Sequence, residues 1–154
     1  MSLAPGDKAP DFTLPTDGGG TLTVSALQGK KVVLYFYPKD DTSGCTAEAC
    51  AFRDSFPDFG GTDAVVVGLS KDSVAAHDKF KKKYALPFTL ASDANSDVCE
   101  KYGVWAEKSM YGRKYMGIER STFLIDKTGT IRGIWRKVKV PGHAAEVLKA
   151  ARAL

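Results

Sequence analysis

Two nearly unbroken apolar runs, residues 32–37 and 64–69, most constrain how this chain can fold. Both runs are rich in β-branched or aromatic residues and lack the polar alternation of a half-exposed strand, which predicts strands buried on both faces. Each run precedes a helical pattern, one beginning near Cys45 and closed by Pro57, the other capped by Asp72 or Ser73. This alternation predicts a sheet with helices packed against both of its faces.

The rest of the chain extends the same pattern. We expect a short strand at 88–91, a helix at 96–102, a hairpin formed by 121–125 and 130–138, a final helix after Pro141-Gly142, and an N-terminal hairpin formed by 11–14 and 22–24. The order of elements resembles the thioredoxin-like arrangement. The sequence therefore predicts one α/β domain over residues 1–154, with a mixed central β-sheet flanked by helices and an N-terminal β-hairpin.

Composition excludes several kinds of protein. The chain has 154 residues, of which 44% are hydrophobic, so it can bury an ordinary core. No apolar run approaches the roughly 20 residues that span a bilayer, and we expect no membrane segment. The 22 Lys and Arg exceed the 18 Asp and Glu by 4, but the cations are scattered. We therefore expect no nucleic-acid partner.

Three cysteines are present, an odd number that does not suit a secreted disulfide scaffold. The chain begins MSLAPGD, which has neither the basic nor the apolar region of an export signal. We therefore expect a cytoplasmic location, where cysteines are reduced. In that compartment a cysteine acquires a special role only through its surroundings.

Cys45 has such surroundings, because it lies in the first turn of the predicted helix after residues 32–37 and a polar loop. Unpaired N–H groups and the helix dipole favour negative charge there. A thiol with the ordinary pKa of about 8.5 is about 3% thiolate at pH 7, and about 3.4 kcal/mol is needed to bring a thiol to a pKa near 6. A helix terminus supplies roughly 1 kcal/mol, so a cation must contribute too.

The residues around Cys45 match a known motif. FYPKDDTSGCT at 36–46 has the Pro-x-x-x-Thr-x-x-Cys spacing of the peroxiredoxins, and FRD at 52–54 follows. Together with MGIERSTFLID at 116–126, it resembles the bacterioferritin comigratory protein, or PrxQ, subfamily. The resemblance covers essentially the whole chain. One departure is Ser43, which stands where the subfamily usually has proline and puts the rigidity of the loop in doubt.

The resemblance implies a role for each matching residue. Cys45 is the peroxidatic cysteine, whose thiolate attacks a peroxide and becomes a sulfenic acid. Thr42 offers its hydroxyl to the peroxide, and Pro38 shields the pocket from water. Arg120 is the cation, and a planar guanidinium suits the charge that grows on both peroxide oxygens. Arg53 is expected to be structural, paired with Asp54 or Glu48; its alternative is a second cation near the sulfur.

Cys50 follows Cys45 by five residues, the spacing of one branch of this subfamily, in which the second cysteine resolves the sulfenic acid as an intramolecular disulfide. In an ideal helix five residues separate Cα atoms by about 9 Å, whereas a disulfide requires less than about 7 Å. If the pair forms, the helix must unwind locally. Cys99 is expected to pack in the core; its alternative is a distant resolving cysteine.

Other signals are weaker. His77 and His143 are isolated in helix-like positions, and we expect them to be solvated. Without metal-ligand spacing or a nucleotide-binding glycine pattern, we expect no metal and no cofactor. Trp105, Tyr111 and Met116 lie in a presumed loop before Arg120, where they either wall a peroxide pocket or pack elsewhere.

These observations predict a thiol-dependent peroxidase that reduces hydrogen peroxide and organic hydroperoxides. By resemblance, a thioredoxin or glutaredoxin-type reductant recycles it, and the chain is a monomer or weak homodimer. One alternative, a thioredoxin-like disulfide oxidoreductase, is disfavoured because Cys45 and Cys50 do not form Cys-x-x-Cys. A second alternative, a non-catalytic redox sensor, stays open, since it needs the same reactive thiol.

Overall fold

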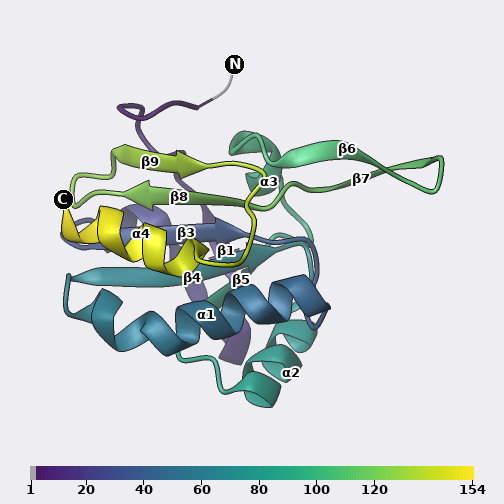
Figure 1. The fold of residues 1–154 in the computed structure, drawn as a ribbon, viewed down its shortest axis with the longest axis horizontal. Coiled ribbons are helices and arrows are strands. Elements are labelled where there is room, and N and C mark those ends of the chain that lie inside the picture. Colours follow the sequence, from purple (N-terminus) through teal and green to yellow (C-terminus); the bar gives the residue numbers. More distant parts are fainter. Residues whose placement is uncertain (1–2) are drawn as a thin grey trace.

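The computed structural model of the chain describes residues 3–154. Its centre is a five-stranded mixed sheet with the order β5-β4-β3-β8-β9 (Figure 1). The strands are β3 (Lys31–Phe36), β4 (Ala64–Ser70), β5 (Thr89–Ser92), β8 (Ser121–Ile125) and β9 (Ile131–Trp135). β3, β4 and β5 run parallel, while β8 and β9 are antiparallel. Every residue of β3 is buried, as the apolar run at 32–37 predicted.

Helices and the N-terminal segment cover the two faces of this sheet. Val33 and Tyr35 of β3 pack in one core cluster with α1 (Ser43–Gly60) and α4 (His143–Arg152). Alternate β3 side chains pack on the opposite face with the N-terminal segment and with α3 (Val98–Lys101). α2 (Val74–Tyr84) lies against β5. Side chains of one strand thus enter two separate cores, which is why the strand reads as continuously apolar.

The N-terminal hairpin is present. It consists of β1 (Thr13–Pro15) and β2 (Thr21–Thr23), which form a separate antiparallel sheet. Two short 3-10 helices, η1 (Asp17–Gly19) and η2 (Val24–Leu27), complete this segment. Each expected strand is displaced by one or two residues.

A second hairpin replaces the presumed loop before Arg120. β6 (Trp105–Met110) and β7 (Arg113–Ile118) pair antiparallel and extend beyond the body of the molecule (Figure 1). Tyr111 and Gly112 connect them, both with positive φ, as in the two-residue turns that suit the twist of a hairpin. The loop prediction was wrong because most side chains of β7 are exposed and supply no apolar alternation.

Two helix boundaries also differ from expectation. α1 does not end at Pro57 but continues to Gly60 with this proline inside it. A proline within a helix removes one backbone hydrogen bond, and Phe59, which is fully buried, holds the last turn against the core. α3 is shorter than the predicted helix at 96–102. No helix within residues 3–154 combines the length and the apolar character of a membrane span.

Candidate active site

The candidate site lies where β3 ends and α1 begins. A loop at 38–42 joins the two elements, and the N-cap of α1 is Thr42, whose carbonyl accepts a hydrogen bond from the Thr46 N–H at 2.8 Å. Cys45 is therefore in the first helical turn, where backbone N–H groups lack partners within the helix. Its side chain is only 1% exposed and joins the apolar face that packs on the sheet. The sulfur thus lies at the positive end of the helix dipole and largely out of water.

Arg120 supplies the cation that the sequence required. One nitrogen of its guanidinium, Nη2, donates to Cys45 Sγ at 3.3 Å, and Nη1 donates to Glu48 Oε1 at 2.7 Å. The residue follows β7 and precedes β8, so the strand adjacent to β3 brings it to the sulfur. A Cβ at Gly44 would lie 3.2 Å from Arg120 Nη2, so glycine leaves the guanidinium the room it needs.

Glu48 is a site residue that sequence reasoning did not identify. It is 1% exposed, and burial raises its pKa to about 7 although the charge and hydrogen bond of Arg120 lower it. Oε1 accepts from Arg120, while the buried Oε2 has no hydrogen-bond partner among the described residues. A signal was available: at 100° per residue Glu48 falls on the same helix face as Cys45 and Phe52, and a carboxylate on an apolar stripe calls for a buried cation.

The two loop residues of the motif, Thr42 and Pro38, lie in the segment that leads into α1. The Thr42 hydroxyl donates to the Lys39 carbonyl at 2.9 Å, which leaves its oxygen lone pairs free. Pro38 is half-buried and, with Trp105 and Met116, lines a cavity of about 320 Å³. Trp105 and Met116 therefore border the loop. The lining of this cavity does not include Cys45 or Arg120, so their place in the wall of a peroxide pocket stays a prediction.

Tyr111 does not border the loop, because it lies at the tip of the β6–β7 hairpin, where it is 98% exposed.

The remaining cysteines occupy different environments. Cys50 is half-buried, five residues along the intact α1 from Cys45, and all three cysteines are free. Cys99 is fully buried in the second core, and this burial raises the pKa of its thiol far above the ordinary range. This core position is the one that the sequence predicted for Cys99. Arg53 pairs with Asp54 at 3.1 Å, one of its two expected partners, whereas the other, Glu48, pairs with Arg120.

The prediction that both histidines are solvated was wrong. His77 is fully buried and His143 is 4% exposed. His143 Nε2 is 2.8 Å from the Thr122 hydroxyl, and burial lowers the pKa of this histidine. Its ring also packs edge-on against Phe52. The sequence carried a signal for this: at 100° per residue His77 lies about 60° from Phe80 and His143 about 40° from Val147, so each histidine shares a helix face with a buried apolar residue.

This geometry defines a thioredoxin-like protein with a cation-bound cysteine at a helix start. Residues 5–134 match the AhpC/TSA family, to which the chain therefore belongs. It is 60% identical over 148 residues to a putative peroxiredoxin Bcp of Coxiella burnetii, covering 96% of this chain and 98% of that protein. It is 52% identical over 152 residues to peroxiredoxin Bcp of Bacillus subtilis, covering 99% and 97% respectively.

Solved structures agree with these relatives. Peroxiredoxin Q of Xanthomonas campestris superposes with a TM-score of 0.88 at 45% identity, covering 92% of this chain and 90% of that one. A PrxQ mutant of Xylella fastidiosa gives 0.94 at 41% identity, covering 99% and 98%. The comparisons confirm the thioredoxin-like fold, the Bcp/PrxQ relationship and the peroxidase class.

Proposed function

We propose that Cys45 is the peroxidatic cysteine of this peroxidase and that Cys50 resolves its oxidised form. The observation that carries the proposal is the 3.3 Å hydrogen bond from Arg120 to Cys45 Sγ at the start of α1. A guanidinium and a helix terminus together favour a thiolate, which is the nucleophilic form of cysteine. No other cysteine of the described chain accepts a hydrogen bond from a cationic side chain at its sulfur.

In the first step the Cys45 thiolate attacks one peroxide oxygen. The S–O bond forms as the O–O bond breaks, which leaves a sulfenic acid and releases water or an alcohol after protonation. Arg120 stabilises the charge that develops on the oxygens. Thr42 accepts a hydrogen bond from the peroxide, since its own proton is already donated to Lys39, and Pro38 keeps water from the sulfur.

In the second step the Cys50 thiolate attacks the Cys45 sulfenic sulfur. The S–S bond forms as the S–O bond breaks, and the oxygen leaves as water. Both cysteines lie in an intact helix, where residues five apart are separated by about 9 Å at Cα, so the first turns of α1 must unwind. The cycle thus alternates between a folded and a locally unfolded form.

A dithiol protein closes the cycle. It reduces the Cys45–Cys50 disulfide by thiol–disulfide exchange and is itself oxidised to a disulfide. We assign this role to thioredoxin or a glutaredoxin-type reductant in a reducing compartment such as the cytoplasm. Hydrogen peroxide and organic hydroperoxides are the assigned substrates. In support of the latter, structures of a Xanthomonas campestris relative concern its alkyl peroxide reduction activity.

Rapid-mixing kinetics test this assignment. Cys45→Ser should show no peroxide-dependent turnover, whereas Cys50→Ser should still consume one equivalent of peroxide but stop at the sulfenic acid. Cys99→Ser is the matched control and should behave like the unmodified protein. Undiminished steady-state turnover of Cys45→Ser would refute the proposal. A Cys45 rate no faster than that of a free thiol would refute it as well.

A further inference from the structure

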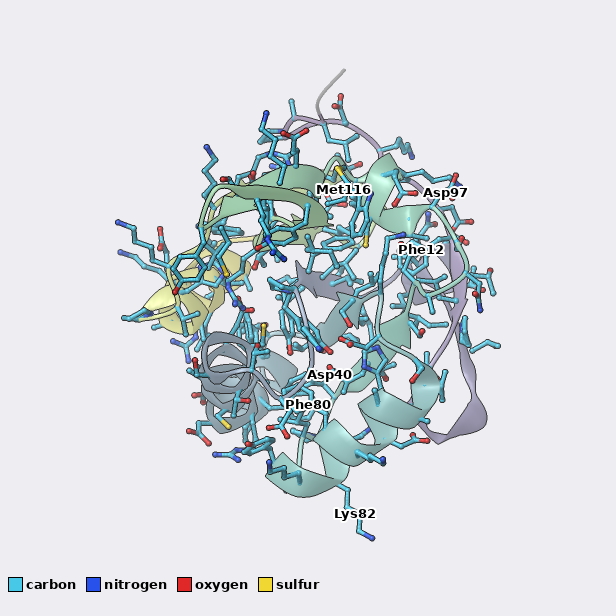
Figure 2. The ribbon with its side chains drawn as sticks, turned by 90° about the vertical axis from the view of Figure 1, so that its right-hand side faces the viewer. Phe12, Asp40, Phe80, Lys82, Asp97 and Met116 are labelled. Carbon is cyan, nitrogen blue, oxygen red and sulfur yellow. The ribbon has the colours of Figure 1, made fainter. Side chains whose placement is uncertain are left out.

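A buried polar cluster lies beneath the loop at 38–42 and takes no part in the chemistry described so far. Asp40, in the middle of the loop, has a side chain only 6% exposed. Its Oδ1 accepts from the Tyr37 hydroxyl at 2.5 Å, and its Oδ2 is 2.6 Å from Nδ1 of His77, which is fully buried on α2. Figure 2 places Asp40 close to Phe80 of α2, and both residues line one surface pocket.

The contacts of His77 determine where its protons are. Nε2 lies 2.9 Å from the carbonyl oxygen of Ala91, which can only accept, so Nε2 carries a proton. A neutral ring would then direct the lone pair of Nδ1 at the Asp40 oxygen 2.6 Å away. A proton between the two atoms removes this repulsion. The pKa of His77 agrees with a shared proton, because it is raised above its ordinary value. Burial lowers this pKa, but the hydrogen bond and the charge of Asp40 outweigh burial.

A metal ion does not account for the cluster. Asp40, Asp72 and His77 offer three ligand atoms within 4.8 Å of one another. Two ligands of a tetrahedral zinc ion lie about 3.3 Å apart, because each is about 2.0–2.1 Å from the metal. The 2.6 Å separation of His77 Nδ1 and Asp40 Oδ2 suits a shared proton instead.

Two other sets of contacts hold the loop, one partly buried and one exposed. The backbone N–H of Asp40 donates to Asp72 Oδ2 at 2.8 Å. Asp41, which adopts positive φ, accepts from Lys83 Nζ and from the Tyr84 hydroxyl, each at 2.8 Å. Exposed ion pairs contribute little, whereas a buried pair is costly to break. The His77–Asp40 pair is therefore the strong attachment of the loop to α2.

We propose that His77 is a positioning residue for the Cys45 reaction. By holding Asp40, it keeps the loop and the first turn of α1 in the folded arrangement in which Cys45 meets Arg120. This inference rests on the proposed cycle, in which the same turn must unwind before Cys50 can reach Cys45. Weakening the His77–Asp40 pair shifts the population toward the unwound form, which slows peroxide reduction and speeds disulfide formation.

Two matched substitutions test the role of Nδ1. The amide nitrogen of His77→Asn can take the place of Nδ1 and still donate to Asp40. That of His77→Gln takes the place of Nε2 and retains only the contact with Ala91. We expect His77→Gln to accelerate disulfide formation at least about fivefold and to slow peroxide reduction, as Asp40→Asn should. Both rates of His77→Asn should lie within about twofold of those of the unmodified protein.

Stopped-flow mixing separates the second-order reaction with hydrogen peroxide from the first-order disulfide formation that follows. Ile131→Val, a core substitution in β9, controls for general loss of stability and should move neither rate. Unmodified protein that does not react with peroxide would overturn the proposed function. If the unmodified protein reacts normally, two results would overturn the positioning role alone. One is that both rates are unchanged in His77→Gln; the other is that His77→Asn and His77→Gln change the two rates equally. In ¹⁵N NMR, both ring nitrogens of His77 should be protonated at pH 7; an unprotonated Nδ1 would also overturn it.

Discussion

Replacing Arg120 by glutamine removes the positive charge beside Cys45 but leaves an amide that can donate to Glu48. In the structure the guanidinium makes two contacts, 3.3 Å to Cys45 Sγ and 2.7 Å to Glu48 Oε1, and its side chain is 16% exposed. A hydrogen bond to a charged group in such a setting contributes roughly 1.5–3 kcal/mol. Because the same group stabilises the thiolate and the departing oxygen, its loss should slow the peroxide reaction about 10- to 150-fold.

Arg120→Lys refines this expectation. A single ammonium retains the charge but cannot reproduce both arms of the planar guanidinium. We therefore expect an intermediate rate. Arg132→Gln, at an exposed ion pair with Asp126, is the matched control and should react normally.

The assay is stopped-flow oxidation of the reduced protein by hydrogen peroxide at pH 7, with the second-order rate constant as readout. Thermal unfolding of each variant shows whether it remains folded. A folded Arg120→Gln variant that reacts within threefold of the unmodified protein would refute the role of the guanidinium.

Three further predictions concern Glu48, Gly44 and Cys99. Because burial raises the pKa of Glu48 to about 7, unfolded chains release its proton near pH 4.5 but folded chains near pH 7, so stability on the order of 3 kcal/mol is lost across this interval. The free energy of unfolding, measured with denaturant, should be lower at pH 7.5 than at pH 5, and Glu48→Gln should not show this difference. An equal difference in the two proteins would contradict the assignment to Glu48. Gly44→Ala places a methyl group 3.2 Å from Arg120 Nη2 and should slow the peroxide reaction severalfold; an unchanged rate would show that the guanidinium moves aside freely. Reduced Cys99 should resist alkylation in the folded protein because it is fully buried; labelling as fast as that of Cys50 would contradict its core position.

The central sheet could be predicted because its strands carry a strong local signal. Residues 32–37 are apolar throughout since β3 faces two cores, and the helix start at Cys45 follows directly from where that strand ends. The hairpin of β6 and β7 gave no such signal. Its strands are largely exposed, and their pairing depends on backbone hydrogen bonds and a two-residue turn at Tyr111 and Gly112.

The candidate site was predictable only in part. Cys45 was assigned through a motif and Arg120 through the requirement for a cation beside it. In the structure the Arg120 guanidinium donates a hydrogen bond to Cys45 Sγ. The partners of buried polar groups depend on long-range packing. Glu48 was named only as a possible partner of Arg53, and the loop residue that contacts His77 lies 37 positions away from it in the chain.

Non-reducing peptide mapping tests the account most directly. Reduced protein is treated with one equivalent of hydrogen peroxide, blocked with an alkylating agent, digested, and its cysteine-containing peptides are identified by mass spectrometry. The account predicts an intramolecular Cys45–Cys50 disulfide, with Cys99 reduced, and a Cys50→Ser variant that retains the sulfenic acid at Cys45. A Cys45–Cys99 bridge, or oxidation that begins at Cys50 while Cys45 stays reduced, would contradict it.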